Sequence, residues 1–597
     1  MERRTAWLAF FRAAIGVLTV FAVAGLVVEF GVPLEPWARG LIRGGQLVLV
    51  GLFALHAALA LAWARDRRAH LRRSWLEVAL LVLILVDIGI GLALTRRGPL
   101  AGAWFVGVQV YLLARLVLSV AHVQEALSRR ALRPALWLFS LYVGAAFAGA
   151  CLLLLPLARA ADTTPFSFTD AFFTAASAVS VTGLSVRDVG SELSFRGQVL
   201  LLALIQLGGL GLVILACAAG FAERGRLSLK ESRLLAEAVG LTDPGRLRRF
   251  LGFAIVFTLA VEAVGAAALW LAVDGRDLEG HDRAWWSVFH AVSAFCNAGF
   301  MLSPASLAAF SGDVAVLATF GVLIVLGGLG FAVHMDLLAL RPLSVATLRW
   351  LRWRLSESAF WPWRHAVFQG AAPPRLSLST KLVLATSAVL IAIGTLAFLL
   401  AERRGVLAGA SAGEQWLCAL FASVSARTAG FQTVDLAPLT GPAILATILL
   451  MAVGASPLST GGGVKTSTLA VAALTLRAMT RDRTEVEAFG RSIPRQVVNA
   501  CVAITALYGL AVLAVTTALL ATQDALAFEE AVFESVSALS TVGLSLDATA
   551  RLDDAGRWIV AGAMLIGRIG PLACLWTFVS RGRALRYRYP EENVIVS

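Results

Sequence analysis

Four copies of one short motif hold the residues of this sequence with the clearest potential for chemistry. Each copy begins with Ser-Ala, carries small or polar residues, and ends with Gly followed by a bulky apolar residue. The glycines recur about every 120 residues, which indicates a fourfold internal repeat. They are Gly183, Gly299, Gly430 and Gly543. Loops of this composition can bring backbone carbonyl oxygens together, and such oxygens are ligands for a dehydrated cation.

The third copy of the motif is one residue shorter than the others. Phe173, Phe289 and Phe533 each lie ten residues before the Gly of their own copy. In the third copy Phe421 lies only nine residues before the Gly. The sequence therefore predicts an arrangement with only approximate fourfold symmetry.

The composition is that of a polytopic membrane protein. Of the 597 residues, 58% are hydrophobic and only 15% are charged, whereas a soluble protein carries roughly 25% charged residues. The net charge of +13 comes from Arg residues in short connections between apolar runs. That distribution is typical of orientation in a membrane and not of nucleic-acid binding. The six Cys have no paired spacing, so we expect neither a disulfide framework nor a metal site.

Residues 1–125 are predicted to form an extension of four transmembrane helices, at about 7–30, 43–64, 75–95 and 102–122. The first apolar run resembles a signal peptide but is long enough to span, so we expect an uncleaved helix. The basic connection at residues 65–73 places Met1 on the cytoplasmic side. Asp87 and Arg115 lie at membrane depth, where single charges are costly, so we expect them to pair.

From about residue 132 onward the pattern changes to four units, each with a helix, a short re-entrant segment and a second helix. The units are 132–225, 246–345, 376–480 and 494–597. The first helices are expected at about 134–157, 250–272, 380–401 and 496–520, and the second helices at about 197–219, 314–338, 441–475 and 556–579. The segments between them contain the motifs and are too short and polar to span. With twelve spans these segments face outside, and the Arg-rich connections and both termini face the cytoplasm.

The connection at residues 341–379 has an unusual composition. It alternates four Trp residues with Arg residues. This alternation is typical of a helix that lies in the membrane interface, with docking of a partner as the alternative.

The four motif segments are predicted to be non-helical at membrane depth. Such backbone survives only where it is buried in protein or lines a water-filled cavity. Four segments around one axis would supply rings of carbonyls that replace the hydration shell of a cation. Gly is needed because carbonyls that face one axis require backbone angles that a Cβ would forbid. The pattern therefore predicts an all-α polytopic membrane protein with four repeats in a pseudo-fourfold arrangement around one ion pore.

The motif copies are similar to the four pore loops of the Trk/Ktr/HKT superfamily of potassium transporters, including the short third loop. Further marks of that family are the sequences at residues 206–211, 327–331, 489–491, 567–571 and 589–592. The resemblance covers about 132–597. It identifies the candidate selectivity-filter residues for K⁺: Ser180, Val181, Thr182, Gly183, Cys296, Asn297, Ala298, Gly299, Arg427, Thr428, Ala429, Gly430, Ser540, Thr541, Val542 and Gly543.

The resemblance implies a bacterial Trk/Ktr-type potassium uptake subunit of the cytoplasmic (inner) membrane, with four M1–P-loop–M2 repeats. In that superfamily a Ser in place of the first-repeat Gly is associated with sodium transport, so Gly183 favours potassium. Complexes of the family are usually dimers of the pore subunit on a cytosolic, nucleotide-binding regulatory ring. The resemblance therefore implies a homodimer and a separate ring protein as partners.

The second helix of the third unit is interrupted at residues 454–466, which contain three consecutive glycines. Three glycines in a row cannot hold a membrane helix, so we expect an unwound segment that lines a cavity. Its likeness to a phosphate-binding loop is superficial, because Val464 stands where that motif has Gly. The segment is similar to the intramembrane gate loop of the same family. The candidate gate residues are Ser459, Thr460, Gly461, Gly462, Gly463, Lys465 and Arg568.

Five charged residues within the bundle are open to more than one interpretation. Lys465 and Arg568 are buried cations that either cap loop carbonyls or act on the gate and the ions. Glu262 and Glu534 are expected to pair with a neighbouring cation or a loop amide, with direct ion binding as the alternative. Arg427 is expected to be an anchor to a helix end or a carboxylate, although it lies within the third filter copy.

We therefore expect this chain to take up potassium through a gated pore that is regulated from the cytoplasm, with no cofactor of its own. Sodium or mixed-cation transport is the alternative within the same class. A membrane enzyme would need a cluster of His, Asp or Cys at one membrane face, and the sequence has none. A sensor built on a degenerate pore is suggested only by residues 1–125.

Overall fold

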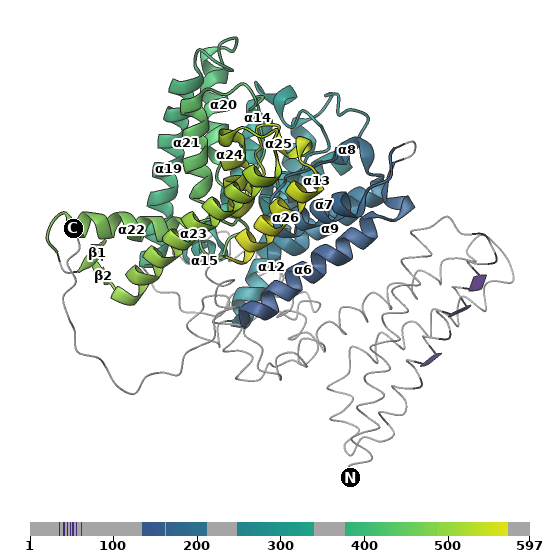
Figure 1. The fold of residues 1–597 in the computed structure, drawn as a ribbon, viewed down its shortest axis with the longest axis horizontal. Helices are drawn as coiled ribbons and strands as arrows, with labels where there is room; N and C mark the ends of the chain where they lie inside the picture. The colour runs from purple at the N-terminus through teal and green to yellow at the C-terminus, as the bar shows by residue number, and fades with distance from the viewer. Residues whose placement is uncertain are drawn as a thin grey trace, which may run out of the picture.

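The computed structural model describes residues 134–160, 163–211, 247–338, 376–483 and 485–570, with a few isolated positions between 35 and 61. Within these ranges the fold is helical apart from one two-stranded hairpin (Figure 1). The elements are α6 (Pro134–Leu153), η1 (Pro156–Ala158), α7 (Phe168–Ser180), α8 (Val189–Glu192), α9 (Phe195–Leu210), α12 (Leu247–Ala272), α13 (Arg283–Cys296), η3 (Ala308–Phe310), α14 (Val314–Leu329), α15 (Phe331–Leu338), α19 (Leu378–Glu402), α20 (Ala412–Ser425), α21 (Gly441–Ala452), α22 (Thr466–Met479), β1 (Val486–Ala488), β2 (Arg491–Ile493), α23 (Arg495–Thr522), α24 (Phe528–Ser540), α25 (Ala548–Arg551) and α26 (Asp554–Ile569).

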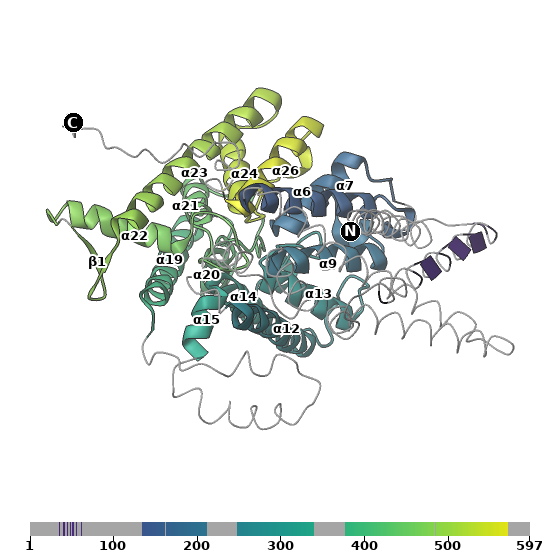
Figure 2. The ribbon, with the colours of Figure 1, turned by 90° about the horizontal axis from the view of Figure 1, so that it is seen from below.

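The order of the helices recurs four times along the chain. Each group begins with a long helix (α6, α12, α19 or α23) and continues with a shorter one (α7, α13, α20 or α24). It ends with α9, with α14 and α15, with α21 and α22, or with α26. Figure 2 shows the groups following one another around a common centre, from blue through teal and green to yellow.

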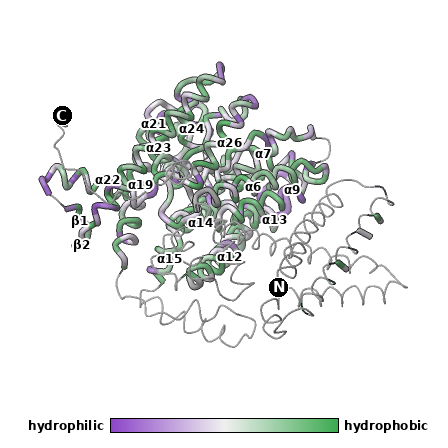
Figure 3. The backbone as a smooth tube through the Cα atoms, turned by 60° about the horizontal axis from the view of Figure 1, so that its bottom comes forward, coloured by the Kyte–Doolittle hydropathy of each residue, from purple (hydrophilic) through white to green (hydrophobic). Residues whose placement is uncertain are grey.

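The short helices lie at the centre and the long helices surround them. Every side chain of α7 from Asp170 to Ser180 is buried, and so is every side chain of α24 from Phe533 to Ser540. In contrast, only 11% of the most apolar 18-residue window of α23 is buried inside the protein. Figure 3 shows that apolar residues predominate along the outer helices, and on α23 Leu510 and Leu513 are exposed. A helix that is apolar on its exposed face matches a lipid environment, so the fold is that of an all-α membrane protein.

Three single helices in the described part of the chain are long and apolar enough to cross a membrane, and α14 and α15 together would form a fourth. The three are Phe250–Ala272, Leu378–Glu402 and Arg495–Thr522. The predicted second helices of groups one, two and four are interrupted. Helices α9, α14 and α26 end at Leu210, Leu329 and Ile569, and the Gly that follows each of them has positive φ. The predicted continuations over 212–219 and 571–579 lie outside the described residues. The unbroken helix predicted over 314–338 is wrong, because α14 and α15 are bent by 97° at Gly330.

A β-hairpin that the sequence analysis does not predict follows α22. Strands β1 and β2 are antiparallel, with Val486 opposite Ile493 and Ala488 opposite Arg491. Phe489 and Gly490 form the two-residue turn, and both have positive φ, as a type I′ turn requires. Val486, Ala488 and Ile493 are buried against α22 and α23.

Several predictions concern residues that the structure does not describe. They include the four helices of residues 1–125, for which only isolated positions are described, and the proposed pair of Asp87 and Arg115. The Trp-rich connection at residues 341–375 also lies outside the described residues. These predictions stay predictions.

Candidate functional site

The loops that follow α7, α13, α20 and α24 meet in a ring, and we call them the glycine loops. A Cβ on Gly299 would lie 2.9 Å from the carbonyl oxygen of Ala429 and 3.2 Å from the Cα of Gly430. The other three glycines make the equivalent contact with the next loop: Gly183 with Ala298, Gly430 with Val542, and Gly543 with Thr182. Because the fourth loop contacts the first, the ring is closed, with the loops in chain order.

The glycine loops share one backbone conformation. The residue two positions before each Gly is left-handed, and each Gly also has positive φ. The four left-handed residues are Val181, Asn297, Thr428 and Thr541. At Gly543, where φ is +96°, a Cβ would collide with the carbonyl oxygen of Thr182, so only Gly fits. The third loop keeps this geometry although its motif copy is one residue shorter. Helix α20 ends early, at Ser425, and this early end accommodates the shortening.

The Ser that begins each motif copy holds its glycine loop in place. Ser177 Oγ accepts a hydrogen bond from the Gly183 N–H at 3.0 Å, and Ser537 Oγ accepts one from the Gly543 N–H at 3.2 Å. In the other two loops the hydroxyl donates to the carbonyl that follows the Gly. Ser293 Oγ donates to Phe300 O at 2.8 Å, and Ser425 Oγ donates to Phe431 O. The candidate list from the sequence misses these four serines, although they are the first residue of every copy.

The side chains at the ends of two short helices contact the surrounding long helices. Ser540 Oγ lies 2.5 Å from the hydroxyl of Tyr508 on α23, and the Cys296 thiol lies 3.7 Å from Glu262 Oε1 on α12. Ser180 instead donates to the Ala176 carbonyl of its own helix at 2.6 Å, and its Oγ lies 2.7 Å from Thr182 Oγ1 in the first glycine loop.

Arg427 is placed in the third glycine loop, but its side chain contacts α19. Its Nη2 donates to Ser387 Oγ at 3.2 Å, and its Nε has no hydrogen-bond partner among the described residues. The predicted partner of Arg427, a helix end or a carboxylate, is therefore wrong. The guanidinium reaches a hydroxyl on the neighbouring long helix.

The four short helices end at the ring and therefore direct their dipoles at it. The C-terminus of a helix carries a partial negative charge, which favours a cation. The opposite ends are held by caps. The Ser411 hydroxyl and Glu414 form a capping box on α20, and the hydrogen bond from the Ser411 N–H lowers the pKa of Glu414. Asp282 caps α13 by accepting from the Trp285 N–H at 3.0 Å.

The linker between α21 and α22, residues 453–465, lies directly against the ring. A Cβ on Gly461 would collide with Thr428 Oγ1, and one on Gly462 would collide with Thr541 Oγ1. Both threonines are the left-handed residues that begin their glycine loops. The glycines of the linker are therefore in contact with one side of the ring.

Backbone hydrogen bonds join the linker to the second group of helices. The Ser456 N–H donates to Gly328 O at 3.0 Å, and the Phe331 N–H donates to Leu458 O at 3.0 Å. The Thr460 N–H donates to Gly327 O at 3.3 Å. Ser459 Oγ donates to Ser456 O at 2.6 Å and so stays within the linker.

Two cationic side chains bind the carbonyls of the linker. Lys465 Nζ lies 2.7 Å from Gly461 O and 3.4 Å from Gly462 O. Arg568 on α26 donates to Thr460 O and also to Gly208 O on α9. The interpretation that both cations cap loop carbonyls thus agrees with the geometry. Arg568 in addition connects the linker to the first and fourth groups of helices.

Glu262 and Glu534, the two buried carboxylates that the sequence analysis singles out, have partners other than those predicted. Glu262 Oε2 accepts from Gln206 Nε2 at 3.2 Å. Glu534 Oε2 accepts from Ser545 Oγ at 2.9 Å, and its other oxygen accepts from Thr549 Oγ1. The expected cation or loop amide is therefore replaced by neutral side chains, because hydroxyl and amide groups can satisfy a carboxylate inside a bundle.

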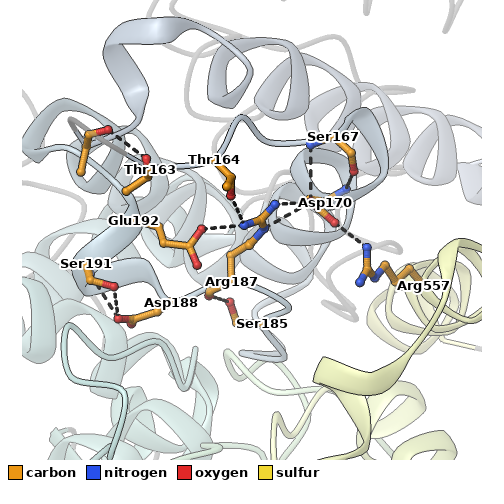
Figure 4. Close-up of polar contacts among 11 residues, drawn as sticks. Thr163, Thr164, Ser167, Asp170, Ser185, Arg187, Asp188, Ser191, Glu192 and Arg557 are labelled. Atoms are coloured by element: carbon orange, nitrogen blue, oxygen red, sulfur yellow. Dashed lines mark hydrogen bonds and ion pairs between the residues drawn. The ribbon is translucent and has the colours of Figure 1, made fainter.

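An ion-pair network that the sequence analysis misses lies at the end of α7 away from the ring (Figure 4). Asp170 has an almost buried side chain and accepts from Arg187 at 3.3 Å and from Arg557 at 2.7 Å. Arg187 also donates to Glu192 at 3.1 Å and to Thr164 at 2.7 Å. Since Arg557 belongs to α26, the network joins the first group of helices to the fourth. No sequence pattern pairs residues that are so far apart in the chain.

Comparisons with known proteins identify the family of this chain. The TrkH family model, described as a cation transport protein, matches residues 148–583. The chain is 36% identical over 459 residues to Ktr system potassium uptake protein B of Vibrio alginolyticus, which covers 76% of this chain and 93% of the relative. It is 31% identical over 458 residues to potassium/sodium uptake protein NtpJ of Enterococcus hirae, which covers 75% and 94%. The chain therefore belongs to the TrkH family of cation transport proteins.

A solved structure supports the same fold. The potassium transporter TrkH from Vibrio parahaemolyticus matches with a TM-score of 0.56 and 18% identity, over 85% of this chain and 98% of that one. The family resemblance read from the sequence is confirmed. The prediction that the chain is not an enzyme is also confirmed, because the relatives are named as transport proteins.

Proposed function

We propose that this chain takes up potassium across the bacterial cytoplasmic membrane. In this proposal four M1–P-loop–M2 repeats surround one ion pore, and residues 1–125 add four transmembrane helices. The glycine loops form the selectivity filter and face outside, while both termini are cytoplasmic. This orientation follows from the Arg-rich connections of the sequence.

The closed ring of glycine loops is the observation that carries the proposal. Each loop has positive φ at its Gly and lies within contact distance of the next loop. Consecutive carbonyls of such loops can face a common axis and replace the water around a cation. The C-terminal ends of the four short helices add partial negative charge at the same place.

Potassium is favoured over sodium by the residue at position 183. Gly183 leaves the first loop without a side chain next to Ala298. The relatives named as potassium uptake proteins support this choice. The second candidate is transport of both ions, which is favoured by the similarity to a protein named as a potassium/sodium uptake protein.

The linker at residues 453–465 is the proposed gate. Its glycines contact the cytoplasmic side of the filter through Thr428 and Thr541. Lys465 and Arg568 hold its carbonyls in the closed position. Opening requires these contacts to be exchanged for contacts with water, and a hydrogen bond to a charged group contributes about 1.5–3 kcal/mol.

Two partners complete the proposal. The chain forms a homodimer, and a cytosolic nucleotide-binding ring protein controls its gate. Two relatives are named as proteins of a "Ktr system", and this name supports an assembly with more than one component. If residues 1–125 are a sensor module, their deletion will leave uptake intact and abolish a regulatory response.

Rubidium uptake into vesicles that contain the purified chain tests the proposal. Each charge gains about 2.3 kcal/mol per 100 mV, so an inside-negative potential should drive uptake. We expect uptake to be inhibited by external potassium and to proceed in the absence of sodium. Uptake that needs sodium, or sodium uptake of equal rate, would instead support the mixed-cation candidate. Vesicles without protein are the control.

A further inference from the structure

A groove with a volume of about 780 Å³ lies between α19, α22 and the hairpin. Its floor is apolar and includes Val389 and Leu390 of α19 and Leu469 and Ala473 of α22. Figure 2 shows α22 and β1 at the outer edge of the molecule. The groove therefore faces the surroundings of the protein and not the ion pathway.

One end of the groove is basic. Arg477, Arg481 and Arg483 line it together with Glu485 and Glu487. Arg483 is ion-paired with Glu487 at 3.2 Å. Within the described residues, the side chains of Arg477 and Arg481 have no ion-pair partner. These two guanidinium groups can therefore bind an anion at the mouth of the groove.

The apolar and the basic residues lie at opposite ends of the groove. Helix α22 begins next to Lys465 at the ring and ends at Met479. Leu382 near the start of α19 clusters with Ala478 near the end of α22. The distance along α22 from Leu469 to Arg477 is about 12 Å at 1.5 Å per residue. By the positive-inside rule, the arginines lie at the cytoplasmic surface.

We propose that this groove binds an anionic phospholipid, with its phosphate at Arg477 and Arg481 and an acyl chain along α19 and α22. Guanidinium groups bind phosphate in a bidentate manner, and basic pockets between membrane helices on the cytoplasmic side bind anionic headgroups. Exposed apolar residues around the groove, such as Leu476 and Met479, are suited to hydrocarbon. A free anion would make no use of the apolar floor, and the basic end distinguishes this groove from a purely apolar contact with a second copy.

Native mass spectrometry of the full chain in detergent tests this proposal. Phosphatidylglycerol and phosphatidylcholine with the same acyl chains are added in turn, and retained lipids are counted. We expect wild type to prefer phosphatidylglycerol. The double variant Arg477→Gln/Arg481→Gln should lose that preference by about fivefold per arginine. Ala473→Phe, which fills the floor, should reduce the binding of both lipids.

The matched control is Arg403→Gln/Arg404→Gln, two exposed arginines at the opposite end of α19. It should bind lipid as wild type does. Equal retention of both lipids by wild type would overturn the proposal, and so would an unchanged preference in the double variant. Displacement of the lipid by an equal concentration of inorganic phosphate would show a simple anion site. A shift of the monomer–dimer ratio in Ala473→Phe without loss of lipid would assign the groove to a second copy.

Discussion

The end of the third group of helices differs from the ends of the other three. In groups one, two and four, a Gly on the second helix packs directly against a carbonyl near the end of a short helix. The pairs are Gly208 with Val179, Gly327 with Phe295, and Gly567 with Leu539. In group three, α21 has no Gly after its first residue and ends at Ala452, and the chain continues as the linker.

This difference separates a close-packed frame from the segment that we propose as the gate. A Gly packed against a backbone carbonyl leaves no space, and close-packed interiors transmit strain instead of yielding. The linker is held instead by separate hydrogen bonds and by two cationic side chains. Water can replace such contacts one at a time. Groups one, two and four therefore build the frame of the ring, and the proposed gate belongs to group three.

The largest effect should come from breaking the frame. A Cβ in Gly327→Ala would collide with the Phe295 carbonyl, whereas Gly321 on the same helix has open space around it. Overpacking costs about 1–3 kcal/mol, so rubidium uptake by Gly327→Ala should fall by up to about a hundredfold. Gly321→Ala is the control and should transport normally. Equal uptake by the two variants would show that α14 does not support the ring.

Shortening the linker should have the next largest effect, in the opposite direction. Deletion of residues 458–464 removes the carbonyls that bind Lys465 and Arg568. Loss of a charge-assisted contact is worth about 1.5–3 kcal/mol, so basal flux should rise by about tenfold or more. Vesicle flux without any regulatory partner measures this. Unaltered flux would count against the linker as the gate.

A smaller increase is expected for Arg568→Gln, because one side chain is lost and the linker remains. Through Arg568 the Thr460 carbonyl of the linker is joined to α26, and the same side chain donates to Gly208 O on α9. We expect a rise in basal flux of about fivefold. Arg551→Gln, which breaks the Glu530 ion pair on the other side of the ring, is the control. A loss of flux in Arg568→Gln would instead assign the guanidinium to the frame.

The smallest effect should come from the Asp170 network, which joins groups one and four. Asp170→Asn and Arg557→Gln change the local charge in opposite directions but break the same contact. The Arg557 side chain is 23% exposed, and an ion pair that solvent reaches contributes about 1 kcal/mol or less, so the preference for potassium over sodium should fall by about twofold in both variants. If Asp170→Asn and Arg557→Gln shift ion flux in opposite directions, the charges of the network affect the flux and the contact between groups one and four does not.

The sequence predicts the ring well because the ring depends on local rules. In three copies the Gly follows the helix end by three residues, and in the third copy, where α20 ends earlier, it follows by five. The left-handed residue two positions before each Gly is kept in all four copies. The interruption at residues 454–466 is visible for the same reason, since consecutive glycines cannot continue a helix.

What the sequence does not reveal depends on partners that are distant in the chain. The network of Asp170 with Arg557 and the contact of Arg427 with Ser387 join separate helices. The bend at Gly330 also follows from its surroundings, because the Pro457 carbonyl of the linker occupies the space beside that Gly. Hydrophobic pattern alone reads α14 and α15 as one span.

The reversal potential under bi-ionic conditions, with potassium on one side and sodium on the other, tests the filter most directly. Gly183→Ser adds a side chain where the first loop contacts Ala298 of the second. The account predicts that wild type prefers potassium and that Gly183→Ser shifts the reversal potential towards equal permeability of the two ions. A reversal potential that stays unchanged in Gly183→Ser would show that the glycine loops are not the selectivity filter.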